Sequence, residues 1–220
     1  MKTDKALIFD FNGTLFWDTS YNREAWDFIA LKYRGKIFSD AEMHMLNGRT
    51  NIETIPYLFG GFCDQEIVNR ISREKEDVYR AICEKQAPLS LAPGAETLFK
   101  EAMQQGIPLA IATSACPDNM DAYKKWFALS RYFDDEYIIT DNGIRKGKPE
   151  PDIYLDTCKA LNREPSTCIV FEDTRSGILS ATKAGIREIY AIASNGADIQ
   201  TTKAMEHVHG LLSDFRQFSL

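Results

Sequence analysis

The sequence predicts an α/β protein with a doubly wound, Rossmann-like parallel sheet and an inserted helical domain. Short apolar runs that fit buried strands alternate with helical patterns along most of the 220 residues. The alternation is interrupted once, over residues 18–88, where only helical patterns occur. A chain of this length suits one large sheet domain that carries a smaller insert.

Apolar runs that fit the strands of the sheet are Ala6–Phe9, Leu109–Ala112, Tyr137–Thr140, Cys168–Phe171 and Glu188–Ile192. Almost continuous apolar sequence is typical of parallel strands that are covered on both faces. The first run ends at Asp10, and the chain then turns through Asn12 and Gly13. A carboxylate at this end of a parallel strand lies at the edge where open α/β sheets bind ligands. Asn-Gly also favours a plain hairpin turn, with Asp10 as an ordinary strand-end residue.

The region without strands contains the helical stretches Tyr21–Tyr33 and Gln65–Glu84, the second of them amphipathic and rich in charge. We expect residues 18–88 to form a helical cap and residues 1–17 and 89–220 to form the α/β core. Two connectors that contain proline lead back into the core and would act as hinges.

Helical patterns also separate the later strands. Ala95–Met103 keeps helical spacing after Pro93 and Gly94, and Gly106 is placed to end this helix. The residues between the third and fourth runs predict a helix with one face on the sheet. The tail after Asn195 has only a weak pattern, from which we predict no element.

Composition excludes several classes of protein. A net charge of −6 and a pI near 5.2 do not fit a nucleic-acid-binding or anionic-membrane surface. No apolar stretch approaches the roughly 20 residues of a membrane span, and the N-terminus leads into a strand and not a signal peptide. We therefore expect a cytoplasmic protein, a monomer or weak dimer. The five cysteines are expected to be reduced packing residues: Cys63, Cys83, Cys116, Cys158 and Cys168.

Small hydroxyl side chains follow the second strand, at Thr113 and Ser114. Because a helix starts nearby, a hydroxyl and adjacent backbone N–H groups can bind a phosphate oxygen there. The alternative is that one of these side chains only caps the helix.

Charged residues mark two further loops. Lys148 precedes a proline-rich helix start, and Glu172 and Asp173 end the fourth strand. A fixed ammonium neutralises charge around a phosphoryl group, and carboxylates at the tips of adjacent strands can supply oxygen ligands to Mg²⁺. The alternatives are a solvated basic loop at Lys148 and a helix cap at Asp173.

These four segments, in this order, resemble the motifs of the haloacid dehalogenase-like phosphohydrolases. Asp10 to Leu15 resembles the first motif, Asp-x-Asp-Gly-Thr-Leu, with Asn12 in place of its second Asp. The position of the helical insert resembles the β-phosphoglucomutase-like branch. The resemblance implies a Mg²⁺-dependent hydrolase that acts on a small phosphorylated metabolite, with sugar phosphates as the expected class.

The resemblance also implies roles for the residues. Asp10 would be the nucleophile that forms an aspartyl-phosphate, and Thr113, Ser114 and Lys148 would hold the phosphate oxygens. Mg²⁺ would be bound by Asp10, the backbone carbonyl of Asn12 and Asp173, with Glu172 acting through a water or from a second layer.

Asn12 limits this interpretation. In the family, the residue at this position protonates the leaving oxygen and then deprotonates the attacking water. A carboxamide does neither, and such proton transfer contributes about 10²–10⁴-fold to the rate. Three outcomes follow: a slow phosphatase that favours good leaving groups, an enzyme whose cap supplies the proton, or a phosphate-binding regulatory protein with little turnover. Asn12 before Gly13 is also prone to deamidation, which would place an Asp or isoaspartate at this position in some molecules.

Alternatives remain for the role of Arg49 and for the class of activity. In the loop Asn47-Gly48-Arg49-Thr50, Arg49 either grips a second anionic group of the substrate or is a solvated surface residue. A mutase of the same branch is the nearest variant of the hydrolase. A receiver domain shares the Asp, hydroxyl and Lys chemistry but has no large insert after its first strand. A phosphonate hydrolase would need a cap lysine, for which Lys32 and Lys36 are the candidates.

Overall fold

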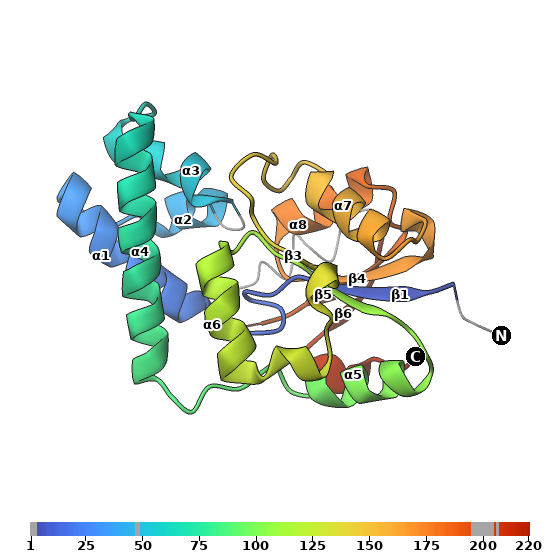
Figure 1. Ribbon diagram of the computed structural model, residues 1–220. Helices are drawn as coiled ribbons and strands as arrows, with labels where there is room; N and C mark the ends of the chain where they lie inside the picture. Colours follow the sequence, from blue (N-terminus) through green and yellow to red (C-terminus); the bar gives the residue numbers. More distant parts are fainter. Residues whose placement is uncertain (1–3, 47–48, 195–204, 206) are drawn as a thin grey trace.

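The computed structural model describes residues 4–46, 49–194, 205 and 207–220, and its centre is a six-stranded parallel sheet (Figure 1). The strand order is β3-β2-β1-β4-β5-β6. The strands are β1 (Ala6–Phe9), β2 (Leu109–Ala112), β3 (Ile138–Ile139), β4 (Cys168–Glu172), β5 (Glu188–Ile192) and β6 (Val208–Leu212). The doubly wound α/β class predicted from the sequence is confirmed.

The direction of winding reverses at β1. From β1 the chain adds β2 and β3 on one side, and it then crosses to β4, β5 and β6 on the other. In such sheets ligands bind beyond the carboxyl ends of the strands at this switch point. Asp10 and Glu172 lie at the carboxyl ends of the two strands that meet there. Because β1 pairs in parallel with both β2 and β4, the alternative of a hairpin after β1 is wrong.

Side chains alternate across the sheet and build a core on each face. Leu7 and Phe9 of β1 pack into one core, and Ala6 and Ile8 pack into the other. Helices α5 (Ala95–Gln104) and α6 (Pro117–Phe127) cover the first face, and helices α7 (Asp152–Ala160) and α8 (Arg175–Lys183) cover the second (Figure 1).

The segment between β1 and α5 contains, among its described residues, only helical elements. They are α1 (Thr19–Arg34), α2 (Asp40–Leu46), α3 (Asn51–Thr54), the 3₁₀ turn Ile55–Phe59 and α4 (Gln65–Lys85). Helices α1, α2 and α4 and the 3₁₀ turn share an apolar core of their own around Trp26 and Ile71. The C-terminal half of α4 leaves this core, and its Tyr79 and Ile82 pack into the core under the sheet. Helix α4 thus connects the two parts and runs beside α6 (Figure 1).

Several elements differ from the prediction. Strand β3 is shorter than Tyr137–Thr140 because Tyr137 ends a 3₁₀ turn, Asp135–Tyr137. Strand β6 lies in the tail for which we predicted no element. It is a partly exposed edge strand that contains His209 and Gly210, so it has little apolar pattern.

The described helices and the cysteines agree with what the sequence leads us to expect. None of the described helices has a stretch that is both long and apolar enough to span a membrane. All five cysteines are free thiols, as expected.

Candidate active site

A buried lysine holds two acidic strand ends together. Lys148 comes from the loop before α7, and its side chain is 2% exposed. Its Nζ donates to Asp10 Oδ1 at 2.6 Å, to Glu172 Oε1 at 2.6 Å and to the carbonyl oxygen of Ala112 at 3.3 Å. The alternative of a solvated basic loop is therefore wrong, and the ends of β1, β2 and β4 meet at one ammonium group.

Asp173 completes an acidic cluster with Asp10 and Glu172. One oxygen atom from each of the three buried carboxylates lies within 4.8 Å of the other two. Asp173 Oδ1 accepts from Thr14 Oγ1 at 3.1 Å. The alternative in which Asp173 caps α8 is wrong, because the cap is Thr174, whose side chain accepts from the N–H of Gly177.

Glycines make room for the cluster. A Cβ atom on Gly13 would lie 2.1 Å from Asp173 Oδ2, and the φ angle of Gly13 is +81°. A Cβ atom on Gly177 would lie 1.7 Å from Glu172 Oε1. Any larger residue at either position would displace a carboxylate.

The electrostatics of the cluster show an excess of negative charge. Burial raises the pKa of Asp10 to about 7, with Lys148 lowering it and Glu172 raising it. Burial also raises the pKa of Asp173 well above its usual range, and the neighbouring carboxylates add to this effect. Burial opposes the charge of Lys148, but Asp10 and Glu172 outweigh it and raise the lysine pKa.

The donor set fits a hard divalent cation. Three carboxylates face a single ammonium, and clustered carboxylate oxygens are the ligands that Mg²⁺ prefers in proteins. A cation held in this cluster would compensate the charge that Lys148 leaves unbalanced.

Thr113 and Ser114 line the same pocket as Asp10 and Lys148, at the end of β2. The Thr113 side chain is buried, and its Oγ1 accepts from the N–H of Ala115 at 3.1 Å. The cap of α6 is Cys116, which makes no side-chain capping bond. The helix-cap alternative is therefore wrong for both residues.

The side chain of Asn12 is held by a buried polar group. Its Nδ2 donates to Asp18 Oδ2 at 2.7 Å, and the hydroxyl oxygens of Tyr123 and Tyr79 lie 2.9 and 3.1 Å away. The Tyr79 hydroxyl also donates to Asp18 Oδ2. Burial raises the pKa of Asp18, although hydrogen bonds from Tyr79 and Asn12 oppose this. The sequence did not lead us to Asp18, Tyr79 or Tyr123.

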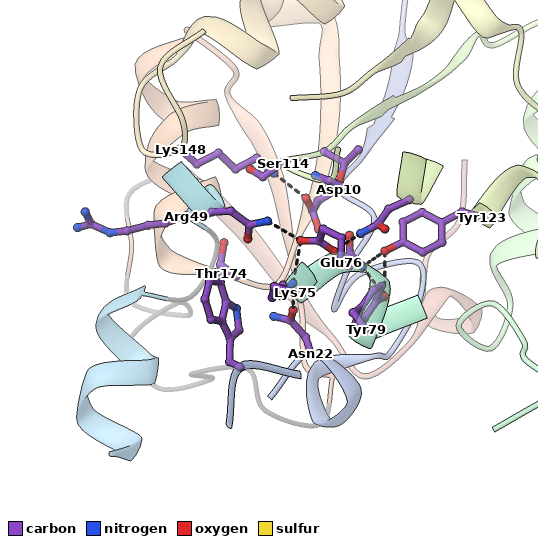
Figure 2. A pocket seen from close by; sticks show the side chains of 16 residues that line it. Asp10, Asn22, Arg49, Lys75, Glu76, Tyr79, Ser114, Tyr123, Lys148 and Thr174 are labelled. Carbon is purple, nitrogen blue, oxygen red and sulfur yellow. Dashed lines mark hydrogen bonds and ion pairs between the residues drawn. The ribbon is translucent and has the colours of Figure 1, made fainter. Parts of the chain in front are cut away.

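Arg49 lines the pocket but is exposed, and its guanidinium points away from Asp10 and Glu76 (Figure 2). Its neighbours Asn47 and Gly48 lie outside the described residues. The position of Arg49 fits the mouth of the pocket better than its centre.

The wall opposite Asp10 was missed by the sequence analysis. The pocket has a volume of about 100 Å³, and Lys75, Glu76 and Tyr79 of α4 line it together with Asn119 of α6 (Figure 2). Lys75 and Glu76 follow Ile71 by four and five residues, so they lie on the apolar side of an amphipathic helix. Two charged residues on the apolar side of this helix are the sign of a polar site that the sequence contains.

Comparison with known proteins gives one family. A family model described as haloacid dehalogenase-like hydrolase matches residues 5–185. A validoxylamine A 7'-phosphate phosphatase from Streptomyces hygroscopicus is 32% identical over 182 residues, which cover 83% of each chain. The β-phosphoglucomutase of Bacillus subtilis is 29% identical, over 83% of this chain and 80% of its own.

A solved structure is similar over nearly its whole length. It is a haloacid dehalogenase hydrolase of family IA, variant 3, from Entamoeba histolytica. The TM-score is 0.89 at 36% identity, with coverage of 98% of this chain and 96% of that chain. The sheet and the helical segment thus share their arrangement with a related hydrolase structure.

Proposed function

This chain belongs to the haloacid dehalogenase-like hydrolases and is a phosphohydrolase enzyme of their β-phosphoglucomutase-like branch, and on that premise we propose a Mg²⁺-dependent phosphatase that acts on a phosphorylated carbohydrate. The observation that carries the proposal is the Lys148 ammonium, which binds the carboxylates of Asp10 and Glu172 and lines one pocket with Asp10 and Thr113.

The residues divide the chemistry between them. Asp10 attacks the phosphorus atom, the bond from phosphorus to the leaving oxygen breaks, and an aspartyl-phosphate forms. Lys148, Thr113 and Ser114 hold the oxygens of the transferred group and stabilise the charge that spreads over them. Water then cleaves the aspartyl-phosphate, which releases phosphate and restores the Asp10 carboxylate.

The metal site is part of the proposal. The side chains of Asp10 and Asp173 and the backbone carbonyl of Asn12 would hold Mg²⁺, with Glu172 behind them. When bound, the ion neutralises negative charge on the phosphoryl group and lets it approach the carboxylate.

The source of the proton for the leaving group limits the rate expected for this site. The amide of Asn12 carries no acid, and its Nδ2 donates to Asp18. The hydroxyl of Tyr79 on α4, which contacts Asn12, has a pKa well above its usual value because of burial and the charge of Asp18, which makes it a poor acid. We therefore favour a slow phosphatase with a preference for good leaving groups over an enzyme whose cap supplies the proton.

The helical segment completes the proposal. We propose that residues 18–88 form a cap that closes on the sheet and excludes bulk water from the transfer. Lys75, Glu76 and Tyr79 of α4 line the pocket with Asp10, which supports this role.

The test is release of inorganic phosphate from p-nitrophenyl phosphate and from a panel of sugar phosphates, with Mg²⁺ and with EDTA. We expect Mg²⁺-dependent release that Asp10→Asn abolishes. Equal rates for the unaltered chain and Asp10→Asn would reject the proposal. A mutase would instead return an isomerised sugar phosphate, which chromatography of the products detects.

A further inference from the structure

The wall opposite Asp10 carries a buried carboxylate. Glu76 projects from α4 into the pocket, and it is 7% exposed. Its Oε1 accepts from Lys75 Nζ at 3.0 Å and from Asn51 Nδ2 at 2.6 Å. Its Oε2 accepts from Asn119 Nδ2, which comes from the neighbouring helix α6. A carboxylate oxygen has two lone pairs, so Oε2 can take a second donor from a ligand.

The charge of Glu76 is fixed by these partners. Burial raises the pKa of Glu76, but the Lys75 ammonium and the amides of Asn51 and Asn119 outweigh it, and the pKa lies below its ordinary value of 4.5. Glu76 is therefore ionised at neutral pH.

The ammonium of Lys75 is already compensated. Lys75 Nζ donates to Asn22 Oδ1 at 2.6 Å as well as to Glu76, and it lies 5.2 Å from the ring centre of Trp26 and 5.1 Å from that of Tyr79. An anionic group of a ligand that approached this wall would meet the Glu76 carboxylate next to a lysine whose charge is balanced. Arg49, which also lines the pocket, points away from Glu76 (Figure 2).

The orientation of Asn119 is also fixed. Arg80 Nη1 donates to Asn119 Oδ1 at 2.7 Å, so the Nδ2 end of the amide must face Glu76. Both ends of this core side chain are bound to α4, which keeps the carboxylate pointing into the pocket.

The space beyond Glu76 is lined by apolar residues, amides and hydroxyls, with few charges. An adjoining cavity of about 470 Å³ shares Asn51, Glu76 and Ser114 with the pocket. Asn69, Ser72 and Asn142 line it further out, together with one arginine and one aspartate. Amides and hydroxyls there hydrogen-bond hydroxyl groups of a ligand. The charged side chains that line this cavity, Arg73, Glu76 and Asp141, sum to a net negative formal charge, which does not favour a second phosphate.

We propose that Glu76 determines specificity: it selects leaving groups that are uncharged and rich in hydroxyls, such as those of sugar or polyol monophosphates, and rejects substrates with a second anionic group. This inference rests on the phosphatase function proposed above. The Glu76 carboxylate accepts a hydrogen bond from a hydroxyl of the leaving group. Repulsion between Glu76 and a second anionic group in a buried site disfavours bisphosphates and phosphorylated sugar acids.

The first arm of the test measures binding without turnover. Titration calorimetry of Asp10→Asn with Mg²⁺ compares glucose 6-phosphate with glucose 1,6-bisphosphate. We expect the monophosphate to bind at least about 10-fold more tightly. Equal or tighter binding of the bisphosphate, or no binding of either ligand, would overturn the inference.

The second arm adds Glu76→Gln in the same background, with Glu84→Gln as the matched control on the exposed side of α4. Glu76→Gln should lower the ratio of the bisphosphate Kd to the monophosphate Kd by about 10-fold. Glu84→Gln should leave this ratio unchanged. An unchanged preference in a folded Glu76→Gln protein would contradict the role of Glu76. If that variant does not fold, the comparison of the two ligands in the first arm still decides.

Failure of the proposed function is seen separately. Hydrolysis of p-nitrophenyl phosphate by the chain with Asp10 intact reports the transfer chemistry, whatever the calorimetry shows. A chain that hydrolyses this ester but prefers the bisphosphate would keep the function and lose the inference.

Discussion

The amide at position 12 sets the rate of the proposed reaction. Asn12→Asp should raise Mg²⁺-dependent phosphate release from sugar phosphates by about 100-fold or more, because a carboxyl group restores general acid and base catalysis. The new side chain would face the Asp18 carboxylate, which now accepts from the Asn12 amide at 2.7 Å. This repulsion favours the protonated form of the new carboxyl or its rotation toward the pocket, and both help it to act as the acid.

The control for this prediction is Asn162→Asp, which makes the same chemical change at an exposed position. The measurement compares steady-state rates of the unaltered chain, Asn12→Asp and Asn162→Asp with the same substrate. If Asn12→Asp is no faster than the control, while phosphate release depends on Asp10, another group already supplies the proton.

The second prediction concerns the close approach of Gly13 to Asp173. Gly13→Ala should lower activity by about 100-fold or more, because the Cβ atom would lie 2.1 Å from Asp173 Oδ2 and displace a carboxylate of the acidic cluster. The change should also weaken the protection that Mg²⁺ gives against thermal unfolding.

Gly35→Ala is the matched control. Gly35 has a similar φ angle of +75°, but a Cβ atom there meets nothing within 4 Å. It should cost only the backbone strain, about 1–2 kcal/mol, and keep full activity. Equal activity in the two variants would show that the close approach of Gly13 to Asp173 has no part in the site.

Sequence reasoning found the strand-end residues and missed the wall that faces them. Asp10, Thr113 and Glu172 follow apolar runs, and parallel topology alone brings the ends of such runs to one edge. Lys148 was found through its loop motif, but its contacts with two carboxylates follow from folding of the loop over the sheet. Glu76 reaches the pocket only through packing of α4 against α6, a contact between distant parts of the chain that no local pattern encodes.

At the scale of the element, the Lys75–Glu76 pair makes the stability of α4 depend on pH. The pKa of Glu76 is depressed in the folded protein, against the opposing effect of burial, by Lys75 and by the amides of Asn51 and Asn119. Such a carboxylate stabilises the fold above its ordinary pKa of 4.5, and the contribution is lost as the pH falls through the lower folded value.

Glu76→Gln should therefore be less stable than the unaltered chain near neutral pH, and the difference should shrink as the pH drops from about 5 to about 3. Urea unfolding at several pH values measures it. Glu84→Gln, on the exposed side of the same helix, should show no such trend. A stability difference between Glu76→Gln and the unaltered chain that stays constant over this range would contradict the prediction.

At the scale of the whole molecule, one aromatic cluster joins the sheet to the C-terminal segment. Phe171 of β4 stacks on Phe9 of β1 with ring centres 4.9 Å apart, and it contacts Phe215 and Phe218 near the end of the chain. The rings share the core on one face of the sheet, directly behind the strand ends that carry the site.

Phe171→Ala should lower the free energy of unfolding by about 3–5 kcal/mol, because it leaves a cavity in this core. Phe62→Ala should change it by no more than about 0.5 kcal/mol, since that ring is 85% exposed. Denaturant unfolding of both variants checks the prediction. A small loss at Phe171 would mean that the two strands do not depend on this cluster.

The central claim is that Asp10 accepts a phosphoryl group, and the most direct measurement is the mass of the enzyme during turnover. Without an acid/base group at position 12, the aspartyl-phosphate should be cleaved slowly and accumulate with p-nitrophenyl phosphate, a substrate whose leaving group needs no acid. Rapid acid quench and peptide mass mapping should find one added phosphoryl group on the peptide that contains Asp10. The group should be absent in Asp10→Asn and less abundant in Asn12→Asp. Turnover of the ester with no covalent phosphoryl group at Asp10 would contradict the account.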